Sequence, residues 1–168
     1  MPSGRGFRKM LPRQATVIVL MALVLVPTSL AAPATLVVTP TSVDDYRVSF
    51  RCMFWLPGDK PGDDKLVLQA DDDTVPTQQA LIGINGEKLM LPGKGLKVWN
   101  KKKGHLNLGD MLIVRFGNEA ASVTLRAKVT WLCPVDSEGC EVTRYRARIT
   151  VAKGALSTTL NAVGECGS

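Results

Sequence analysis

The sequence has one histidine, His105, and few aromatic residues, with three Trp, two Tyr and four Phe among 168 residues. Nucleophilic catalysis by a triad needs a base that touches a nucleophile and is oriented by a third group. His105 lies in a turn beside a run of lysines, and no serine occupies a G-x-S-x-G motif. The sequence therefore indicates no triad. It also offers no aromatic-lined groove to accompany a pair of glycan-cleaving carboxylates.

Helical periodicity is almost absent. What recurs is the alternation of apolar and polar residues with a period of two, punctuated by Gly, Asn, Asp and Pro. This pattern predicts roughly nine short strands without crossover helices, which is typical of antiparallel all-β folds. We expect either an antiparallel β-sandwich or a small closed β-barrel of about 8–9 strands, stabilised by disulfides.

The first 31 residues are typical of a secretory signal peptide. Four basic residues and no acid precede an apolar run over residues 15–26, and small residues follow it. The run is shorter than the roughly 20 residues of a membrane span, so we expect cleavage near residues 31–34 and no stable span afterwards. The expected product is a single β domain over residues 35–168, located in the periplasm or outside the cell.

Removal of this leader changes the charge of the chain. Four of the 21 basic residues and none of the 15 acids lie in residues 1–31, so residues 32–168 carry 17 minus 15, a net charge of +2. Nucleic-acid binding depends on clustered excess positive charge. The near balance therefore argues against nucleic acid as a partner.

Four cysteines in an exported chain predict disulfide bonds. Cys133 and Cys140 enclose a short polar turn that suits a local bridge, which leaves Cys52 and Cys166 as the second pair. Three pairings are possible, so the connectivity stays open. A bridge between Cys52 and Cys166 would join the first and last major strands and favours a closed or nearly closed sheet without edges.

Local patterns predict several strands and one hairpin. Asn85-Gly86 between two alternating apolar runs indicates a type I′ turn, because both central residues need positive φ. Residues 110–116 are continuously apolar enough for a central strand covered on both faces. Residues 122–133 alternate, with the apolar set from Val123 to Trp131 pointing inward. Residues 95–99 indicate a separate short strand.

Arg144, Arg146 and Arg148 occupy alternate positions of a strand over residues 142–152, so one face of this strand is a row of like charges. Pairing with residues 122–133 must keep inward faces together. One such register sets Arg126 opposite Arg148, Lys128 opposite Arg146 and Thr130 opposite Arg144. The face is either solvated, with splayed side chains that cover apolar surface, or a docking face. The candidate partner-binding residues are Arg126, Lys128, Arg144, Arg146, Arg148, Arg47 and Arg51, the last two if their strand belongs to the same sheet.

Carboxylates in two neighbouring segments are candidate ligands for Ca²⁺. They are Asp59, Asp63, Asp64, Asp71 and Asp73. Their spacing matches no EF-hand loop, and the cysteine spacing does not suit a zinc site. A solvated acidic loop explains them as well, and we expect neither a metal nor a cofactor.

The layout resembles small exported bacterial β-barrel inhibitors of lysozyme, which tie early and late strands together by a disulfide. The residues that carry the resemblance are "YRVSFRC" near the start and "GEC" near the end. The inhibitory loop expected between them has no match in this sequence.

These observations favour an exported, non-catalytic β domain that binds a macromolecule through its basic face. The expected partner is an acidic protein or an anionic envelope component, since arginine suits bidentate recognition of carboxylate and phosphate. A periplasmic inhibitor or immunity-type protein is the specific form of this hypothesis. The alternative is a carboxylate-dependent hydrolase that acts on envelope glycan.

Overall fold

A computed structural model of the chain describes residues 35–45, 51–59, 65–71, 78–99, 106–134, 137 and 139–167. Within these ranges lie nine strands and one short 3₁₀ helix, η1 (Val43–Asp45). The strands are β1 (Val38–Thr39), β2 (Cys52–Trp55), β3 (Leu66–Ala70), β4 (Gln79–Ile84), β5 (Glu87–Trp99), β6 (Met111–Gly117), β7 (Ser122–Trp131), β8 (Val142–Lys153) and β9 (Leu156–Gly167).

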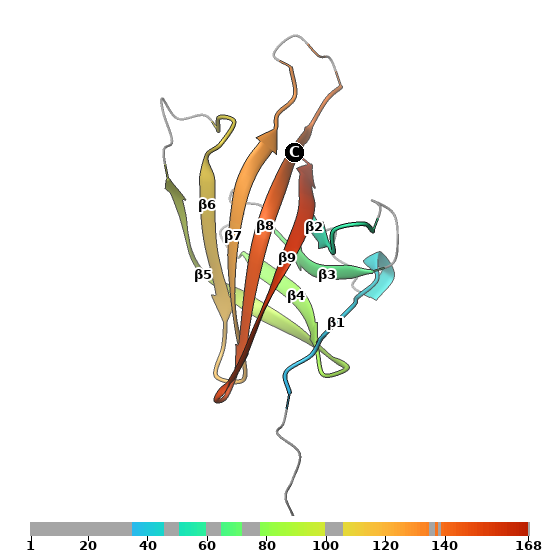
Figure 1. The fold of residues 1–168 in the computed structure, drawn as a ribbon, viewed down its shortest axis with the longest axis vertical. Coiled ribbons are helices and arrows are strands. Elements are labelled where there is room, and N and C mark those ends of the chain that lie inside the picture. The colour runs from blue at the N-terminus through green and yellow to red at the C-terminus, as the bar shows by residue number, and fades with distance from the viewer. Residues whose placement is uncertain are drawn as a thin grey trace, which may run out of the picture. The chain divides into compact units, whose positions relative to one another are not determined.

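The strands form one antiparallel sheet that closes on itself. Their order is β1-β4-β3-β2-β9-β8-β7-β6-β5 (Figure 1). An additional pairing of β5 with β4 closes the run of strands from β4 to β5 into a ring. Strands β2 to β9 therefore make an eight-stranded barrel, with β1 as an extra strand beside β4. Of the two all-β architectures expected from the sequence, the barrel is the one that the chain adopts.

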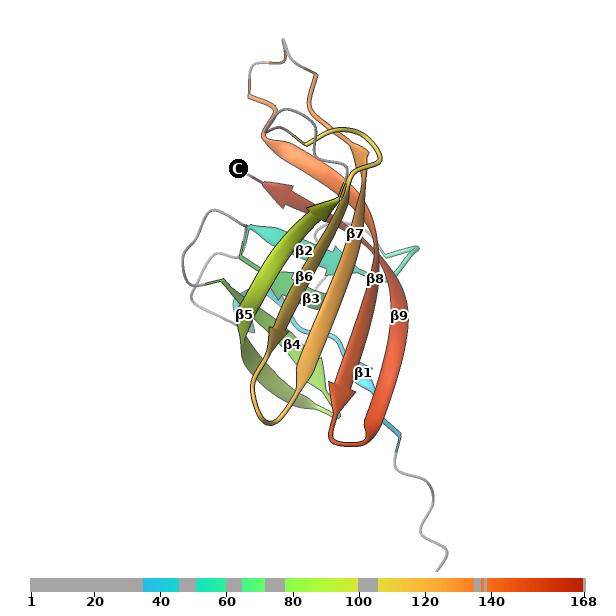
Figure 2. The same ribbon diagram turned by 90° about the vertical axis from the view of Figure 1, so that its left-hand side faces the viewer.

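The barrel wall is uneven. Strands β5 to β9 lie side by side as long strands, whereas β2, β3 and β4 on the other side have four, five and six residues (Figure 2). The strand expected at the start of the barrel covered residues 46–55, of which residues 46–50 lie outside the described part of the chain. The long strands provide the extended surface and the short strands complete the enclosure.

The period-two pattern determines which side chains enter the barrel. In β8, Tyr145, Ala147, Ile149 and Val151 are buried and alternate with exposed or half-buried residues. Full burial of a large apolar side chain stabilises a fold by about 1.5–3 kcal/mol. The inward face expected for residues 142–152 is confirmed, and the barrel interior is the hydrophobic core.

The β4–β5 hairpin has the turn that its sequence predicts. Asn85 and Gly86 have φ angles of 52° and 84°, the positive values that a type I′ turn requires at both positions. The expectation of a separate strand at residues 95–99 is wrong, because β5 runs on from Glu87 to Trp99. A shift of register between Gly93 and Gly95 is the irregularity that lets one strand pair first with β4 and then with β6.

A second register shift, between Val129 and Trp131, corrects another expectation. Val129 is buried in the core, but Trp131 is 36% exposed and pairs with Arg144. An extra residue at this point reverses the parity of the strand, so the side chain that simple alternation sends inward points outward. The sequence shows the alternation and gives no signal for the bulge.

Two disulfides hold the barrel together, with the pairing that the spacing of the cysteines favours. Cys52 and Cys166 face each other across the β2–β9 ladder and are separated by 114 residues. Cys133 and Cys140 are seven residues apart and join the ends of the connection between β7 and β8. The long-range bridge therefore fixes the seam at which the early strands meet the last strand.

We expect the two disulfides to differ in their contribution to stability. Replacing Cys52 and Cys166 with Ala should lower the free energy of unfolding by about 5 kcal/mol, and the same change at Cys133 and Cys140 by about 2–3 kcal/mol, because stabilisation in the loop-entropy model grows with loop length. Urea unfolding of both double variants measures the difference. Equal losses would contradict this origin of the stabilisation.

The β2–β9 seam also depends on a close approach of Phe54 to Gly164, which face each other in the ladder. A Cβ added at Gly164 would lie 2.2 Å from Cδ1 of Phe54. The Phe54 ring in turn lies 6.4 Å from the Tyr145 ring, centroid to centroid. The missing side chain at Gly164 thus makes room for a core aromatic ring.

Gly164→Ala should therefore destabilise the barrel by about 1–3 kcal/mol, since overpacking a core displaces side chains or backbone. Gly167→Ala is the matched control in the same strand, because the nearest atom to its added Cβ is the Glu141 carbonyl oxygen at 3.9 Å. Thermal unfolding of both variants provides the measurement. A loss at Gly167 as large as at Gly164 would show that the Phe54 contact is not the cause.

Candidate functional site

The pairing of β7 with β8 brings basic side chains directly opposite one another. Arg126 faces Arg148 and Lys128 faces Arg146, which is the one of the allowed registers that was set out from the sequence. The third expected pair, Thr130 with Arg144, is wrong because the bulge in β7 sets Trp131 opposite Arg144. Two adjacent like-charge pairs therefore lie on the outer surface of the barrel.

Neighbouring strands extend this surface, which we call the basic wall. It comprises the exposed basic side chains at outward positions of the β5–β6, β6–β7, β7–β8 and β8–β9 ladders: Lys97, Arg115, Arg126, Lys128, Arg144, Arg146 and Arg148. At the outward positions of these four ladders the only acid is Glu165, whose Oε2 lies 4.0 Å from Nε of Arg144. Such an exposed ion pair contributes little to stability. The wall thus carries seven bases and one acid, a net charge of +6.

The rows across the wall mix charge with apolar surface. One row runs from Lys97 through Ile113 and Arg126 to Arg148. The next row places Met111 beside Lys128 and Val163 beside Arg146. Because strands lie about 4.8 Å apart and alternate residues about 6.8 Å apart, the four bases of the two facing β7–β8 pairs form one compact group with apolar residues beside it.

One end of the wall carries an aromatic ring. The guanidinium carbon of Arg144 lies 5.1 Å from the centroid of the Trp131 ring, in a cation–π arrangement. Such a contact contributes about 0.5–1 kcal/mol at exposed sites. It also orients the Arg144 side chain beside a partly exposed apolar ring.

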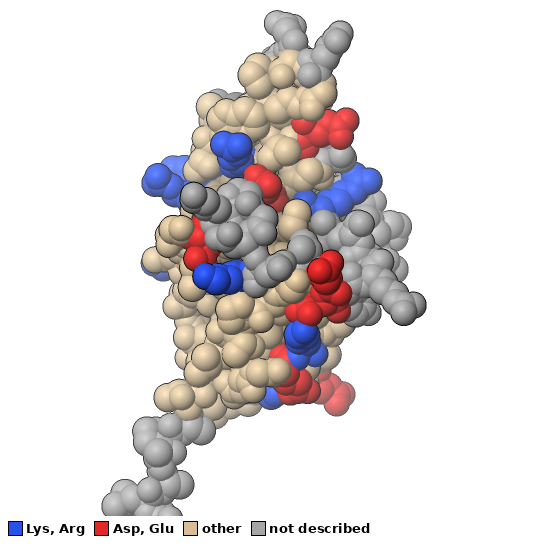
Figure 3. Space-filling view, turned by 90° about the vertical axis from the view of Figure 1, so that its right-hand side faces the viewer, with Lys and Arg blue, Asp and Glu red and all other residues tan. Residues whose placement is uncertain are grey.

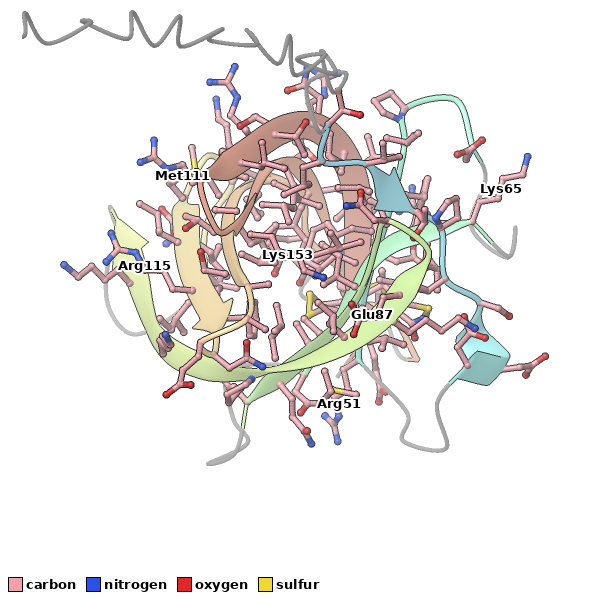
Figure 4. All side chains as sticks on the ribbon, turned by 90° about the horizontal axis from the view of Figure 1, so that it is seen from below. Arg51, Lys65, Glu87, Met111, Arg115 and Lys153 are labelled. Carbon is pink, nitrogen blue, oxygen red and sulfur yellow. A yellow bond between two sulfur atoms is a disulfide. The ribbon has the colours of Figure 1, made fainter. Side chains whose placement is uncertain are left out.

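Two members of the wall, Lys97 and Arg115, were not identified from the sequence. Arg115 lies in the segment that was expected to be covered on both faces, and this expectation is wrong because Arg115 is exposed. Figure 4 shows Arg115 and Met111 pointing away from the barrel. The signal available in the sequence was the single charge inside an apolar run, since a charge there marks the wet face of a strand.

The structure separates the remaining basic candidates from this wall. Arg51 precedes β2, and its carbonyl accepts a hydrogen bond of 2.9 Å from the Gly167 amide. Figure 4 places Arg51 on a different side of the barrel from Met111 and Arg115. Arg47 lies outside the described residues, as do His105 and the adjacent lysine run.

The other described residues have the opposite balance of charge. Outside the wall they include five bases and eight acids, a net charge of −3. On the side of the barrel that Figure 3 shows, Asp and Glu stand among Lys and Arg. Asp45 binds Lys88, and this contact, together with the Ser42 amide, lowers the pKa of Asp45. Among the described residues, the excess positive charge is therefore concentrated on the wall.

The acidic metal candidates are only partly covered by the structure. Asp59 and Asp71 are described, whereas Asp63, Asp64 and Asp73 lie outside the described residues. Within the described part of the chain, no group of three or more His, Cys, Asp or Glu side chains is arranged to hold a metal ion. Asp71 accepts a hydrogen bond from the Gln79 amide instead.

The barrel interior contains a second feature, a cavity of about 510 Å³. Its walls are mainly apolar and include Phe54, Leu96, Leu112, Val114 and Ala127. Both disulfides line it. The cavity extends to Glu141, which is exposed, so it reaches the surface at the end of the barrel where β7 and β8 are connected.

Comparison with other proteins adds no assignment: the chain matches no protein-family model, no curated protein and no solved structure. Two disulfides fit an extracellular or periplasmic location. No helix in the described residues is long and apolar enough to cross a membrane. The site must therefore be interpreted from its own chemistry.

The facing like charges make a prediction about stability. Arg148→Glu replaces the repulsion with Arg126 by an attraction and should raise the free energy of unfolding by about 0.2–1 kcal/mol. The gain should shrink as NaCl is added, because salt screens exposed charges. Arg115→Glu is the control, since Arg115 faces Gly95 and Thr124. Urea unfolding at two salt concentrations provides the test, and an equal gain at both positions would contradict a pairwise effect.

Proposed function

We propose that the protein is an exported, non-catalytic barrel domain that binds an acidic protein through its basic wall. The observation that carries the proposal is the ratio of seven bases to one acid at the outward ladder positions, with two like-charge pairs directly opposed. An inhibitor or immunity-type protein is the specific form of this function. Export is part of the proposal and is supported by the signal-peptide pattern and the two disulfides.

The charge arrangement supports a binding role because it is unfavourable in the free protein. Like charges directly across a ladder reduce stability, and interleaved acids would relieve the repulsion. Among the described residues, eight acids lie beyond the wall and one lies on it. An acidic partner would supply the missing countercharge and would be attracted over a distance of about 8–10 Å at physiological salt.

The apolar residues within the wall favour a protein over a glycan. Ile113, Met111 and Val163 lie half-buried between the basic side chains, and Trp131 stacks with Arg144. Protein interfaces are enriched in Trp, Met and Arg, and the residues that dominate binding are most often Trp, Tyr and Arg. A partner with carboxylates around an apolar patch would match this composition.

Capture from an envelope extract tests the proposal. The processed wild-type protein should retain acidic proteins at 50 mM NaCl and lose most of them at 300 mM NaCl, because an arginine-mediated complex weakens with salt. The variant R146S/R148S should lose the same proteins, at least tenfold by quantitative mass spectrometry. The variant R51S/K65S removes the same charge elsewhere, where Figure 4 places both residues away from Arg115, and should behave as the wild type.

The controls distinguish the possible partners. Equal capture by all three proteins would overturn the proposal. Binding to immobilised heparin that exceeds binding to poly-L-glutamate, and that is lost in R146S/R148S, would assign the wall to an anionic glycan instead of a protein.

The alternative function, a carboxylate-dependent hydrolase acting on envelope glycan, would use Asp71 and Glu141. These are the carboxylates among the described residues that line the cavity. Release of reducing sugars from envelope glycan by the same purified protein, abolished in Asp71→Asn, would favour this alternative over the binding proposal.

A further inference from the structure

We infer that the cavity inside the barrel is a binding site for a neutral, mainly apolar small molecule of about 20 non-hydrogen atoms. The size of the ligand is estimated by proportion. A cavity of about 150 Å³ in another protein holds benzene, which has six non-hydrogen atoms. This cavity measures about 510 Å³, so it has room for about 20 such atoms. The site lies inside the barrel and is independent of the basic wall, so it goes beyond the proposed function.

The core is filled at one end of the barrel and hollow at the other. Leu68, Ile82 and Ile149 are fully buried, as expected for interiors that pack like organic crystals. At the lower end, Nζ of Lys153 lies 2.9 Å from Oε2 of Glu87, which ties β8 to the non-adjacent β5 across the base of the barrel (Figure 4). The hollow part lies toward the opposite end, where the sequence places the small residues Ala70 and Ala127 on the wall.

The lining specifies the chemistry of the ligand. Leu96, Leu112 and Val114 present apolar side chains, whereas polar groups such as Gln78 and Thr143 are few. Ligand sites typically have volumes of about 300–1,000 Å³ and combine apolar walls with a few polar groups. Among the lining residues that the structure describes, the charged side chains are the carboxylates of Asp71 and Glu141. The negative charges of these two acids disfavour an anionic ligand.

Both disulfides restrain the wall of the cavity. Cys52–Cys166 and Cys133–Cys140 both line the cavity, from the β2–β9 seam and from the connection between β7 and β8. Covalent links at two places restrain the wall of the cavity, which reduces the ordering that binding requires. Because the cavity reaches exposed Glu141, a ligand can enter without separation of the strands.

Titration with the neutral fluorophore N-phenyl-1-naphthylamine tests this site. Saturable binding of one molecule per chain is expected, with a rise in the melting temperature as ligand is added, since ligands that bind the folded state stabilise it. Ala127→Phe projects a ring into the cavity and should weaken binding at least tenfold. Ala70→Phe, from the opposite wall, is an independent second variant in case the first fails to fold.

Matched controls separate the cavity from the outer surface. Thr124→Phe places the same ring at an outward position of β7 and should leave affinity unchanged, and so should R146S/R148S. Dodecanol should displace the probe more effectively than dodecanoate. Equal probe affinity in wild type and a folded Ala127→Phe or Ala70→Phe variant would overturn the inference, and stronger displacement by dodecanoate would overturn the neutral class of ligand.

Discussion

The pairing of β2 with β9 is the constraint on which the rest of the structure depends. It joins segments 114 residues apart, and the Cys52–Cys166 disulfide lies within it. Together with the β4–β5 hairpin it closes the sheet, so the eight strands of the barrel have neighbours on both sides. Without this seam Phe54 would lose its place against Gly164, and the barrel would open into a sheet with two exposed edges.

Closure gives each strand one face toward the core and one face toward solvent, and the two faces differ in composition. Inward positions of β8 hold Tyr145, Ile149 and Val151, and outward positions hold its three arginines. The same alternation in β7 places Lys128 and Arg126 outside. A register shift of one residue would exchange the two faces, so burial of the core also fixes the positions of the charges.

The basic wall and the cavity are two features of the barrel that work against its stability. Opposed like charges and an unfilled apolar space both reduce the stability of a barrel. Natural proteins accept such losses where a partner or ligand offsets them. The two disulfides, which both line the cavity, contribute stability at the β2–β9 seam and at the connection between β7 and β8.

Much of the fold was predictable because it depends on local and periodic signals. Alternation identified the strands of the last third, and Asn85-Gly86 identified its hairpin. Parity limited the β7–β8 pairing to registers that include the observed one, in which Arg126 faces Arg148 and Lys128 faces Arg146. The sequence could not locate the bulge before Trp131, because one extra residue leaves the composition and pattern almost unchanged. It could not distinguish a barrel from a sandwich, since both use the same alternating strands.

The all-β class and the row of arginines on one strand follow from the sequence, and the spacing of its cysteines favours the two disulfides without excluding the other pairings. Tertiary structure alone decided that Lys97 and Arg115 join this row, because they come from strands that only closure sets beside β7. It alone also decided that the barrel is hollow at one end. An empty volume is a property of many side chains meeting across the barrel, and no local pattern in the chain records it.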